Sequence, residues 1–245
     1  MMILRTLGSS SAGNCYILDN GSEALVIEAG VSFRMVKEAM LFQTNRICGC
    51  VISHQHNDHA KYIGEFVGAG IPTLALSCVL SSHDVNSYFA RSVQPGKGYK
   101  LGGFKIVPFN ARHDVPCVGY LISHQGMGKL LFVTDTMSLD YTFAGLNHIM
   151  IEANYADDIL QGRIDRGEEH PSRRDRLFET HMELETTKRI LKAHDMSSVE
   201  NIILIHLSND NSDADRFRLE VSQATGVNVV IAKSGLSLEL SQLPY

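Results

Sequence analysis

Apolar residues occur in short runs along the first part of the chain, and turn residues separate these runs. Residues 2–7, 15–19 and 24–28 form three such runs, and apolar runs of this length between turns are typical of β-strands. The dipeptide Asn20-Gly21 lies between the second and third runs. This dipeptide favours a tight hairpin, so we expect these two strands to pair antiparallel.

A different spacing of apolar residues indicates helices. Apolar side chains three and four positions apart in residues 32–42, 63–70 and 212–226 predict helices with one face in the core. Residues 155–195 form the charged, clearly helical region, and residues 78–90 predict one more helix. The remaining apolar runs predict strands at residues 46–53, 72–76, 103–110, 118–123, 129–135, 148–153, 201–208, 227–232 and 236–240.

Hairpin-like strand groups and interleaved helices together predict an α/β (α+β) chain that has two sheets with helices outside them. Residues 1–245 show no long linker, low-complexity segment or fixed-period repeat, so we expect one domain. The content of 44% hydrophobic and 20% charged residues is ordinary for a globular protein.

Charge and cysteine content narrow the functional classes. The formal net charge of −5 argues against an extended basic surface, so any contact with nucleic acid must be local. No apolar run reaches the length of a membrane span, and the N-terminus lacks the pattern of a signal peptide. Five scattered cysteines without a CxxC pair indicate a reduced, cytoplasmic protein. Cys48 and Cys50 are interpreted as small buried side chains of a strand.

The segment that follows the predicted strand at 46–53 concentrates metal-ligand chemistry. Four potential ligands lie within six positions, namely His54, His56, Asp58 and His59. Imidazole and carboxylate groups suit zinc, manganese or iron. On a loop, His54 and His56 can point to the same side, and the next two ligands can face a second ion. The alternative interpretation is a polar, exposed loop that is rich in histidine.

A site that binds two ions needs more ligands than this loop offers, because each ion takes three or more from the protein. Three later apolar runs each end at a further potential ligand, namely His113, Asp135 and His206. Each is individually explained as a capping or solvated residue, but their shared place at strand exits predicts a convergent cluster. Asp135 is the candidate bridge, since a carboxylate has two oxygens. The other histidines are interpreted as surface or capping residues: His83, His124, His148, His170 and His194.

The order of these motifs resembles that of the metallo-β-lactamase-fold metallohydrolases. The resemblance implies an αββα four-layer sandwich with a dinuclear metal centre at one edge. It also implies a ligand assignment, with His54, His56 and His113 on one ion, Asp58, His59 and His206 on the other, and Asp135 between them. Glu28 stands where the family usually has an aspartate that supports the site. This change leaves the ligand set intact.

Further segments are similar to the YycJ/WalJ-like branch of this family, which is associated with DNA metabolism. They are GSSSAGNCYIL at residues 8–18, IEANY at 151–155, HPSRRDRL at 170–177 and IHLSND at 205–210. The segment HMELETT at 181–187 stands where the branch has Gly-His-Leu-Ser, and Thr180 replaces the glycine before the histidine.

The candidate catalytic residues are Asp58 and His181. Two divalent ions, Zn²⁺ or Mn²⁺, would generate a metal-bound hydroxide that attacks a phosphodiester, with Asp58 orienting it. Thr180 and Glu183 have the spacing of a capping box, which predicts a helix with Thr180 as its N-cap and His181 at its first position. There His181 would contact the scissile phosphate or protonate the leaving group. The alternative is an exposed helix-start histidine.

One dense basic cluster occurs in this acidic chain, comprising Arg163, Arg166, Arg173, Arg174 and Arg176. We take Arg173, Arg174 and Arg176 as candidate substrate contacts, because they are placed to hold phosphates near the candidate general acid. Acidic residues are interspersed among them, so ion pairs on a solvated helix are the competing explanation.

The sequence therefore predicts a cytoplasmic dinuclear metallohydrolase that cleaves phosphodiester bonds, as an exonuclease-like enzyme acting on nucleic acid. One alternative is a phosphodiesterase acting on cyclic nucleotides or other small phosphodiesters. Another is a lactone, ester or thioester hydrolase, because the same hydroxide attacks carbonyls. A metal-stabilised binding module without turnover is the alternative outside enzymology. No membrane partner is expected.

Overall fold

Two seven-stranded sheets form the centre of the computed structural model, which describes residues 1–240 and, for Arg173, the backbone alone. The first sheet contains, from one edge to the other, β14 (Ser237–Glu239), β1 (Ile3–Gly8), β2 (Cys15–Asp19), β3 (Ala24–Ile27), β4 (Ile47–Val51), β5 (Thr73–Ala75) and β6 (Ala90–Ser92). The second contains β13 (Asn228–Ile231), β12 (Asn201–Ile205), β11 (His148–Glu152), β10 (Gly128–Val133), β9 (Cys117–His124), β8 (Phe104–Ala111) and β7 (Tyr99–Leu101).

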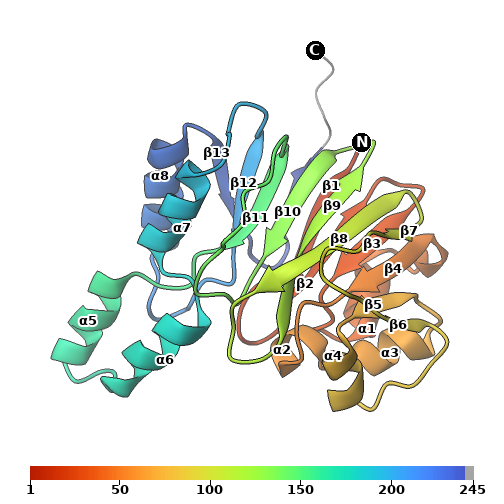
Figure 1. The fold of residues 1–245 in the computed structure, drawn as a ribbon, viewed down its shortest axis with the longest axis horizontal. Coiled ribbons are helices and arrows are strands. Elements are labelled where there is room, and N and C mark those ends of the chain that lie inside the picture. Colours follow the sequence, from red (N-terminus) through yellow and green to blue (C-terminus); the bar gives the residue numbers. More distant parts are fainter. Residues whose placement is uncertain (241–245) are drawn as a thin grey trace.

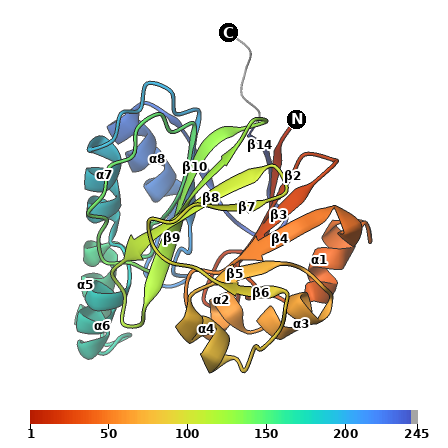
Figure 2. The ribbon, with the colours of Figure 1, turned by 45° about the vertical axis from the view of Figure 1, so that its right-hand side comes forward.

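Helices cover the outer face of each sheet (Figures 1 and 2). On the side of the first sheet lie α1 (Phe33–Ala39), α2 (Asn57–Ala60), α3 (Ile63–Gly68), α4 (Ser77–Ser82) and a short 3₁₀ turn at Thr44–Arg46. On the side of the second, α7 (Leu184–Lys192) and α8 (Ala214–Thr225) cover the sheet, whereas α5 (Asp157–Asp165) and α6 (Ser172–Thr180) lie beyond its strand ends. The layer order is therefore helix, sheet, sheet, helix, which confirms the predicted αββα sandwich.

Each sheet changes from antiparallel to parallel pairing partway across. In the first sheet β1, β2 and β3 pair antiparallel, whereas β3 to β6 are parallel. In the second, β7 to β10 are antiparallel and β10 to β13 are parallel. The pairing of β2 with β3 confirms the hairpin that Asn20-Gly21 predicts. Because the strands of a parallel group all run the same way, their carboxyl ends meet at one edge of the sheet, where ligand sites form.

Three apolar layers hold these elements together. Side chains of both sheets interdigitate in the central layer, where Tyr16 and Phe132 meet edge to face with ring centroids 5.9 Å apart. The first outer layer packs α1 and α3 on the first sheet through the rings of Phe33 and Phe66. The second packs α7 and α8 on the other sheet, and Phe217 is completely buried there. None of the helices in residues 1–240 is long and apolar enough to cross a membrane.

The predicted helix at 78–90 is wrong over its second half. The helix ends at Ser82, and residues 83–89 turn back toward β6. Asp84 adopts a left-handed φ of 51°, which α-helical geometry does not allow. The His83 ring is hydrogen-bonded to the carbonyl of Gln55 at 2.8 Å, so this end of the helix is held against the loop that follows β4.

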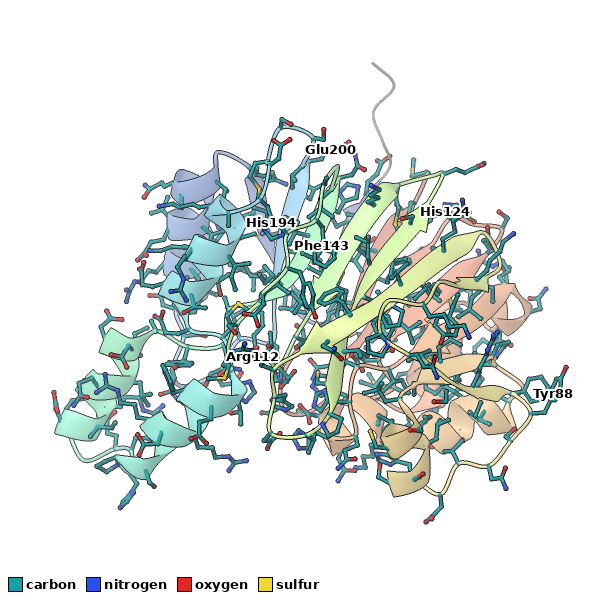
Figure 3. The ribbon with its side chains drawn as sticks, in the orientation of Figure 1. Tyr88, Arg112, His124, Phe143, His194 and Glu200 are labelled. Carbon is teal, nitrogen blue, oxygen red and sulfur yellow. The ribbon has the colours of Figure 1, made fainter. Side chains whose placement is uncertain are left out.

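Three histidines for which the sequence predicts surface or capping positions are buried, namely His124, His148 and His194. His124 pairs with Glu23 at 3.1 Å, and the ring of His194 stacks on Phe143. Figure 3 shows His194 and Phe143 close together and His124 apart from them, toward the opposite side of the second sheet.

Candidate metal centre

The loop after β4 gains its geometry from the short helix that follows it. The strand ends at Val51, and His56 is the N-cap of α2. The amide of His59 donates to the carbonyl of His56 at 2.9 Å, so Asp58 and His59 lie on one helical turn. The amide of Asn14 donates to the carbonyl of Asp58 at 2.7 Å, which fixes this turn against the loop that follows β1.

Three imidazoles meet at one side of this loop. His54 Nε2 lies 3.1 Å from His56 Nδ1, and that same Nδ1 lies 3.2 Å from His113 Nε2. His54 is completely buried, and its other ring nitrogen is 2.9 Å from the hydroxyl of Ser53. His113 follows β8, so the structure brings residues 57 positions apart in the chain into one group.

A second group joins two carboxylates to two imidazoles. Asp58 Oδ2 lies 3.2 Å from His59 Nε2 and 3.4 Å from His206 Nε2. Asp135 Oδ2 lies 3.1 Å from His59 Nε2 and 3.3 Å from His206 Nδ1. The rings of His54 and His59 are 4.3 Å apart, so the two groups are neighbours. All seven residues predicted as metal ligands therefore converge, and their roles as ligands remain predictions.

Three residues of the site have left-handed backbone conformations. They are Glu28 with φ 66°, Asp135 with φ 49° and His206 with φ 54°. Each follows directly or closely on a strand, namely β3, β10 and β12. Such conformations are uncommon for residues other than glycine and cluster at functional sites, where surrounding contacts hold them.

Glu152 is a residue of this site that the sequence prediction missed. It is the last residue of β11 and is completely buried. Its Oε1 atom lies 2.7 Å from His181 Nδ1 and 3.2 Å from His206 Nδ1, and its Oε2 atom accepts from the amide of Met182 at 3.2 Å. Its position at the end of a buried strand is the same signal that marked Asp135, so this signal could have found it.

Glu28 supports the loop from the opposite side. It is completely buried, and its carboxylate accepts from the amide of Ser53 at 3.3 Å. Its Oε1 atom is 3.6 Å from His59 Nδ1. The longer glutamate side chain therefore reaches both the ligand loop and one of its imidazoles.

His181 is at the site, but the predicted capping box is wrong. Thr180 is the last residue of α6, where its hydroxyl donates to the carbonyl of Arg176 at 2.7 Å. Glu183 is the true N-cap of α7, because its carboxylate accepts from the amides of Glu185 and Thr186. His181 therefore lies between the two helices, in extended conformation, and its Nδ1 atom points at Glu152.

The predicted arginine contacts lie on or beside α6 and are only partly available. Arg174 donates to Asp157 at 2.6 Å and to Gln161 at 2.9 Å, so the ion-pair interpretation holds for this residue. Arg176 is exposed on the same helix. The side chain of Arg173 lies outside the described part of the structure.

The two groups differ in charge. Burial holds the pKa of His54 well below its usual value and lowers that of His113, which favours the neutral, ligand form of both rings. In the second group, burial also disfavours the charged form of His206. The carboxylates of Asp135, Asp58 and Glu152 outweigh this effect and raise the pKa of His206 to about 10. The second group therefore carries an excess of negative charge, which the neutral imidazoles of the first group do not compensate.

This donor set fits divalent ions. His206 Nε2 is buried, has no hydrogen-bond partner within residues 1–240 and faces Asp58 Oδ2 at 3.4 Å. Buried polar atoms without partners are rare in proteins, and an ion between nitrogen and oxygen would satisfy both. Three carboxylates are almost completely buried within the site, namely Glu28, Asp135 and Glu152. Buried charges are costly unless they are paired or coordinate metals.

Comparison with known proteins shows which family and which relatives the chain is similar to. Residues 10–140 match the family model described as the metallo-beta-lactamase superfamily. The chain is 25% identical over 233 residues to the exodeoxyribonuclease YycJ of Bacillus anthracis, across 89% of this chain and 86% of that protein. It is 23% identical over 171 residues to the exodeoxyribonuclease WalJ of Streptococcus pneumoniae, across 63% of each chain.

Solved structures share the fold at low sequence identity. The metallo-beta-lactamase fold protein YhfI from Bacillus subtilis superposes with a TM-score of 0.73 at 18% identity, over 98% of this chain and 100% of that one. A diphosphatase from the PhnP family gives 0.66 at 16% identity, over 98% of each chain. Human tRNase Z, short form, gives 0.63 at 13% identity, over 98% of this chain and 100% of that one.

Proposed function

The chain belongs to the metallo-β-lactamase superfamily and is a metal-dependent hydrolase, and we propose that it cleaves phosphodiester bonds in nucleic acid as an exonuclease. One observation carries the proposal. A buried carboxylate, Glu152, holds a partly exposed imidazole, His181, at the edge of the metal centre. This pair is suited to a reaction whose leaving group is an alkoxide.

The proposed ligand set is the predicted one. One ion would be held by His54, His56 and His113, the other by Asp58, His59 and His206, and Asp135 would lie between them. Two Zn²⁺ or Mn²⁺ ions in this position would supply an activated water and neutralise the charge of a phosphodiester. Asp58 would also orient the attacking water.

His181 is proposed as the general acid. Its Nδ1–H donates to Glu152, which fixes the ring and leaves Nε2 free to face the substrate. The side chain keeps 21% of its surface exposed and lines a hollow of about 120 Å³ together with His206, Ser11, Asn154, Leu177 and Asp210. A sugar oxygen leaving from phosphorus needs a proton, and an imidazole at its side can supply it.

The relatives support the choice of nucleic acid. The curated proteins named above are exodeoxyribonucleases, and one of them is similar over most of its length. The five cysteines are free, which supports the predicted reducing, cytoplasmic compartment.

A small phosphodiester, such as a cyclic nucleotide, is the second candidate substrate. The ion pair between Arg174 and Asp157 favours it, because this arginine is already neutralised and less available to a long phosphate backbone. A lactone or thioester is a weaker candidate, since such substrates have less need of the Glu152–His181 pair.

Turnover by metal-analysed protein tests the proposal. The substrates are end-labelled single-stranded and double-stranded DNA, RNA, a cyclic nucleotide and a lactone, and the control is Asp135→Ala. We expect stepwise shortening of a labelled nucleic acid. Activity on the lactone alone would overturn the assignment.

The general acid is tested separately through the leaving group. We expect His181→Ala to keep its metal content and to cleave a nucleic acid roughly a hundredfold more slowly. The same variant should cleave an aryl phosphodiester at nearly the wild-type rate, because a nitrophenolate leaves without a proton. An equal loss on both substrates would remove His181 from this role.

A further inference from the structure

A larger cavity lies beside the metal centre, and neither the proposed ligands nor the general acid uses it. Its volume is about 660 Å³, which is within the range of small-molecule sites. The loop after β1, the start of α1, the segment after His206 and the segment after β13 form its walls. These segments follow the carboxyl ends of β1, β12 and β13, so the cavity opens at the same edge of the sheets as the metal centre.

The cavity is apolar on one wall and hydroxyl-rich on another. Val31, Met35 and Leu7 line the apolar wall, and Met35 is 41% exposed although it is a large hydrophobic residue. Ser10 and Ser234 line the polar wall. A nucleotide has the matching parts, since its base has a polarisable face that thioether sulfur contacts favourably and its phosphate accepts hydrogen bonds.

Among the described residues, one cation and no carboxylate line this cavity. The cation is Lys233, which is exposed in the segment after β13. Within residues 1–240, no carboxylate lies within ion-pair distance of its ammonium group. By contrast, many of the other arginines and lysines pair with acids, among them Arg163, Arg174 and Lys188. An unpaired lysine in a protein of net charge −5 is available to an anion.

The cavity and the hollow at His181 are neighbours. They share three wall residues, Leu207, Ser208 and Asn209. The hydroxyl of Ser9, which also lines the larger cavity, accepts from the amide of His206 at 3.0 Å. A chain of nucleotides that places one phosphate at the metal centre can therefore place an adjoining nucleotide in the cavity.

We propose that this cavity binds the nucleotide next to the scissile phosphate, with its own phosphate at Lys233 and its base against Met35 and Val31. The proposal rests on the proposed phosphodiesterase function and adds to it the part of the substrate that the chain recognises. It explains how an acidic protein without an extended basic surface can hold a nucleic acid locally.

Steady-state kinetics of Lys233→Gln test the phosphate contact. On a short single-stranded oligonucleotide we expect KM to rise roughly tenfold and kcat to stay unchanged, because one charged hydrogen bond is lost outside the reacting group. On an aryl phosphodiester, which cannot reach the cavity, both constants should stay as in the wild type. The matched control is Lys105→Gln, which removes the same charge from β8 near the opposite edge of the sheets.

A larger side chain in the cavity tests the contact with the base. Ala214 is exposed at the first position of α8 and lines the cavity, so Ala214→Trp can narrow it with little risk to folding. We expect this variant also to raise KM for the oligonucleotide alone. Unchanged KM in both Lys233→Gln and Ala214→Trp would overturn the subsite, even when the oligonucleotide is cleaved.

Direct binding separates the subsite from the reaction. The probe is a fluorescein-labelled phosphorothioate oligonucleotide, which resists cleavage, and its affinity is measured by anisotropy at several salt concentrations. Loss of one phosphate contact in Lys233→Gln should reduce the salt slope by about 0.7. Binding that depends on Lys233, without turnover of any phosphodiester, would support the subsite and overturn the proposed reaction. Turnover with an unchanged salt slope and KM in Lys233→Gln would support the reaction and overturn the subsite.

Discussion

The two halves of the metal centre are built in different ways. One half comes from a single loop and helical turn, residues 54–59, so its proposed ligands are neighbours in the chain. The other half collects His113, Asp135, Glu152 and His206 from the ends of four separate strands of the second sheet. The first half can be predicted from the spacing of its residues in the sequence, whereas the residues of the second half come together only when the sheet is formed.

The two ligand groups described above each draw residues from both halves, and they differ in what they offer an ion. Burial keeps His54 and His113 neutral, so their group provides lone pairs without charge. Carboxylates dominate the other group, and Asp135 is close to imidazoles of both halves. A shared carboxylate at the junction means that the halves are expected to depend on each other.

The largest expected effect is that of Asp135→Ala. Because Asp135 lies at the junction, we expect the loss of both ions and a fall in kcat of at least about a thousandfold. The matched variant His56→Ala changes the loop half alone and should retain one ion. Metal analysis of both purified variants checks the stoichiometry, and equal metal loss in the two would contradict the distinction between a shared and an unshared ligand.

Glu152→Gln should have the next largest effect. It removes the charge that holds both His181 and His206, and loss of a carboxylate behind a ligand imidazole typically costs 10- to 100-fold in activity or affinity. Glu28→Gln is the counterpart in the loop half. Its contact with His59 is longer, at 3.6 Å, so we expect a smaller loss in kcat. A greater loss for Glu28→Gln would reverse this order.

Removal of metal should destabilise the protein. Ions at a thousand times their Kd stabilise a folded chain by about 4 kcal/mol, which for a chain of this size corresponds to a shift in Tm of roughly 10 °C. We therefore expect a chelator to lower the Tm of the wild type by that order and to leave the Tm of Asp135→Ala almost unchanged. Calorimetry with and without chelator measures both shifts, and equal shifts would show that the ions do not bind at the junction.

A smaller effect concerns acid stability away from the site. Burial lowers the pKa of His148 to about 4, against 6.5 in an unfolded chain. Between these values the unfolded state binds more protons, so stability falls as the pH falls from 6.5 to 4, by about 3 kcal/mol in total. Above pH 6.5 this residue contributes no pH dependence.

The variant His148→Gln should remove that dependence. Urea unfolding at pH 7 and pH 4.5 would show a smaller difference in unfolding free energy for the variant than for the wild type. An identical difference would show that His148 does not contribute to the acid sensitivity.

Much of this arrangement could be predicted from sequence. Alternating turn residues and apolar runs located most strands, and strand exits located the three dispersed residues that we propose as ligands. The sequence prediction omits Glu152 because it treats this residue as part of the apolar run at 148–153 and of the segment IEANY, not as a buried charge. The boundary of α7 was wrong because Thr180 and Glu183 have the letters of a capping box. Tertiary contacts hold the chain extended between α6 and α7, namely those of Met182 with Glu152 and Asn154 and that of Leu184 with Tyr155.

The left-handed backbone at Glu28, Asp135 and His206 limits how this enzyme can evolve. Aspartate and histidine adopt such a φ more readily than most residues, so at two positions one residue type serves both chemistry and chain geometry. Glutamate at position 28 lacks that advantage. Drift there is expected to favour aspartate or asparagine, which ease the backbone, over any β-branched residue, and saturation mutagenesis at these codons should recover that order.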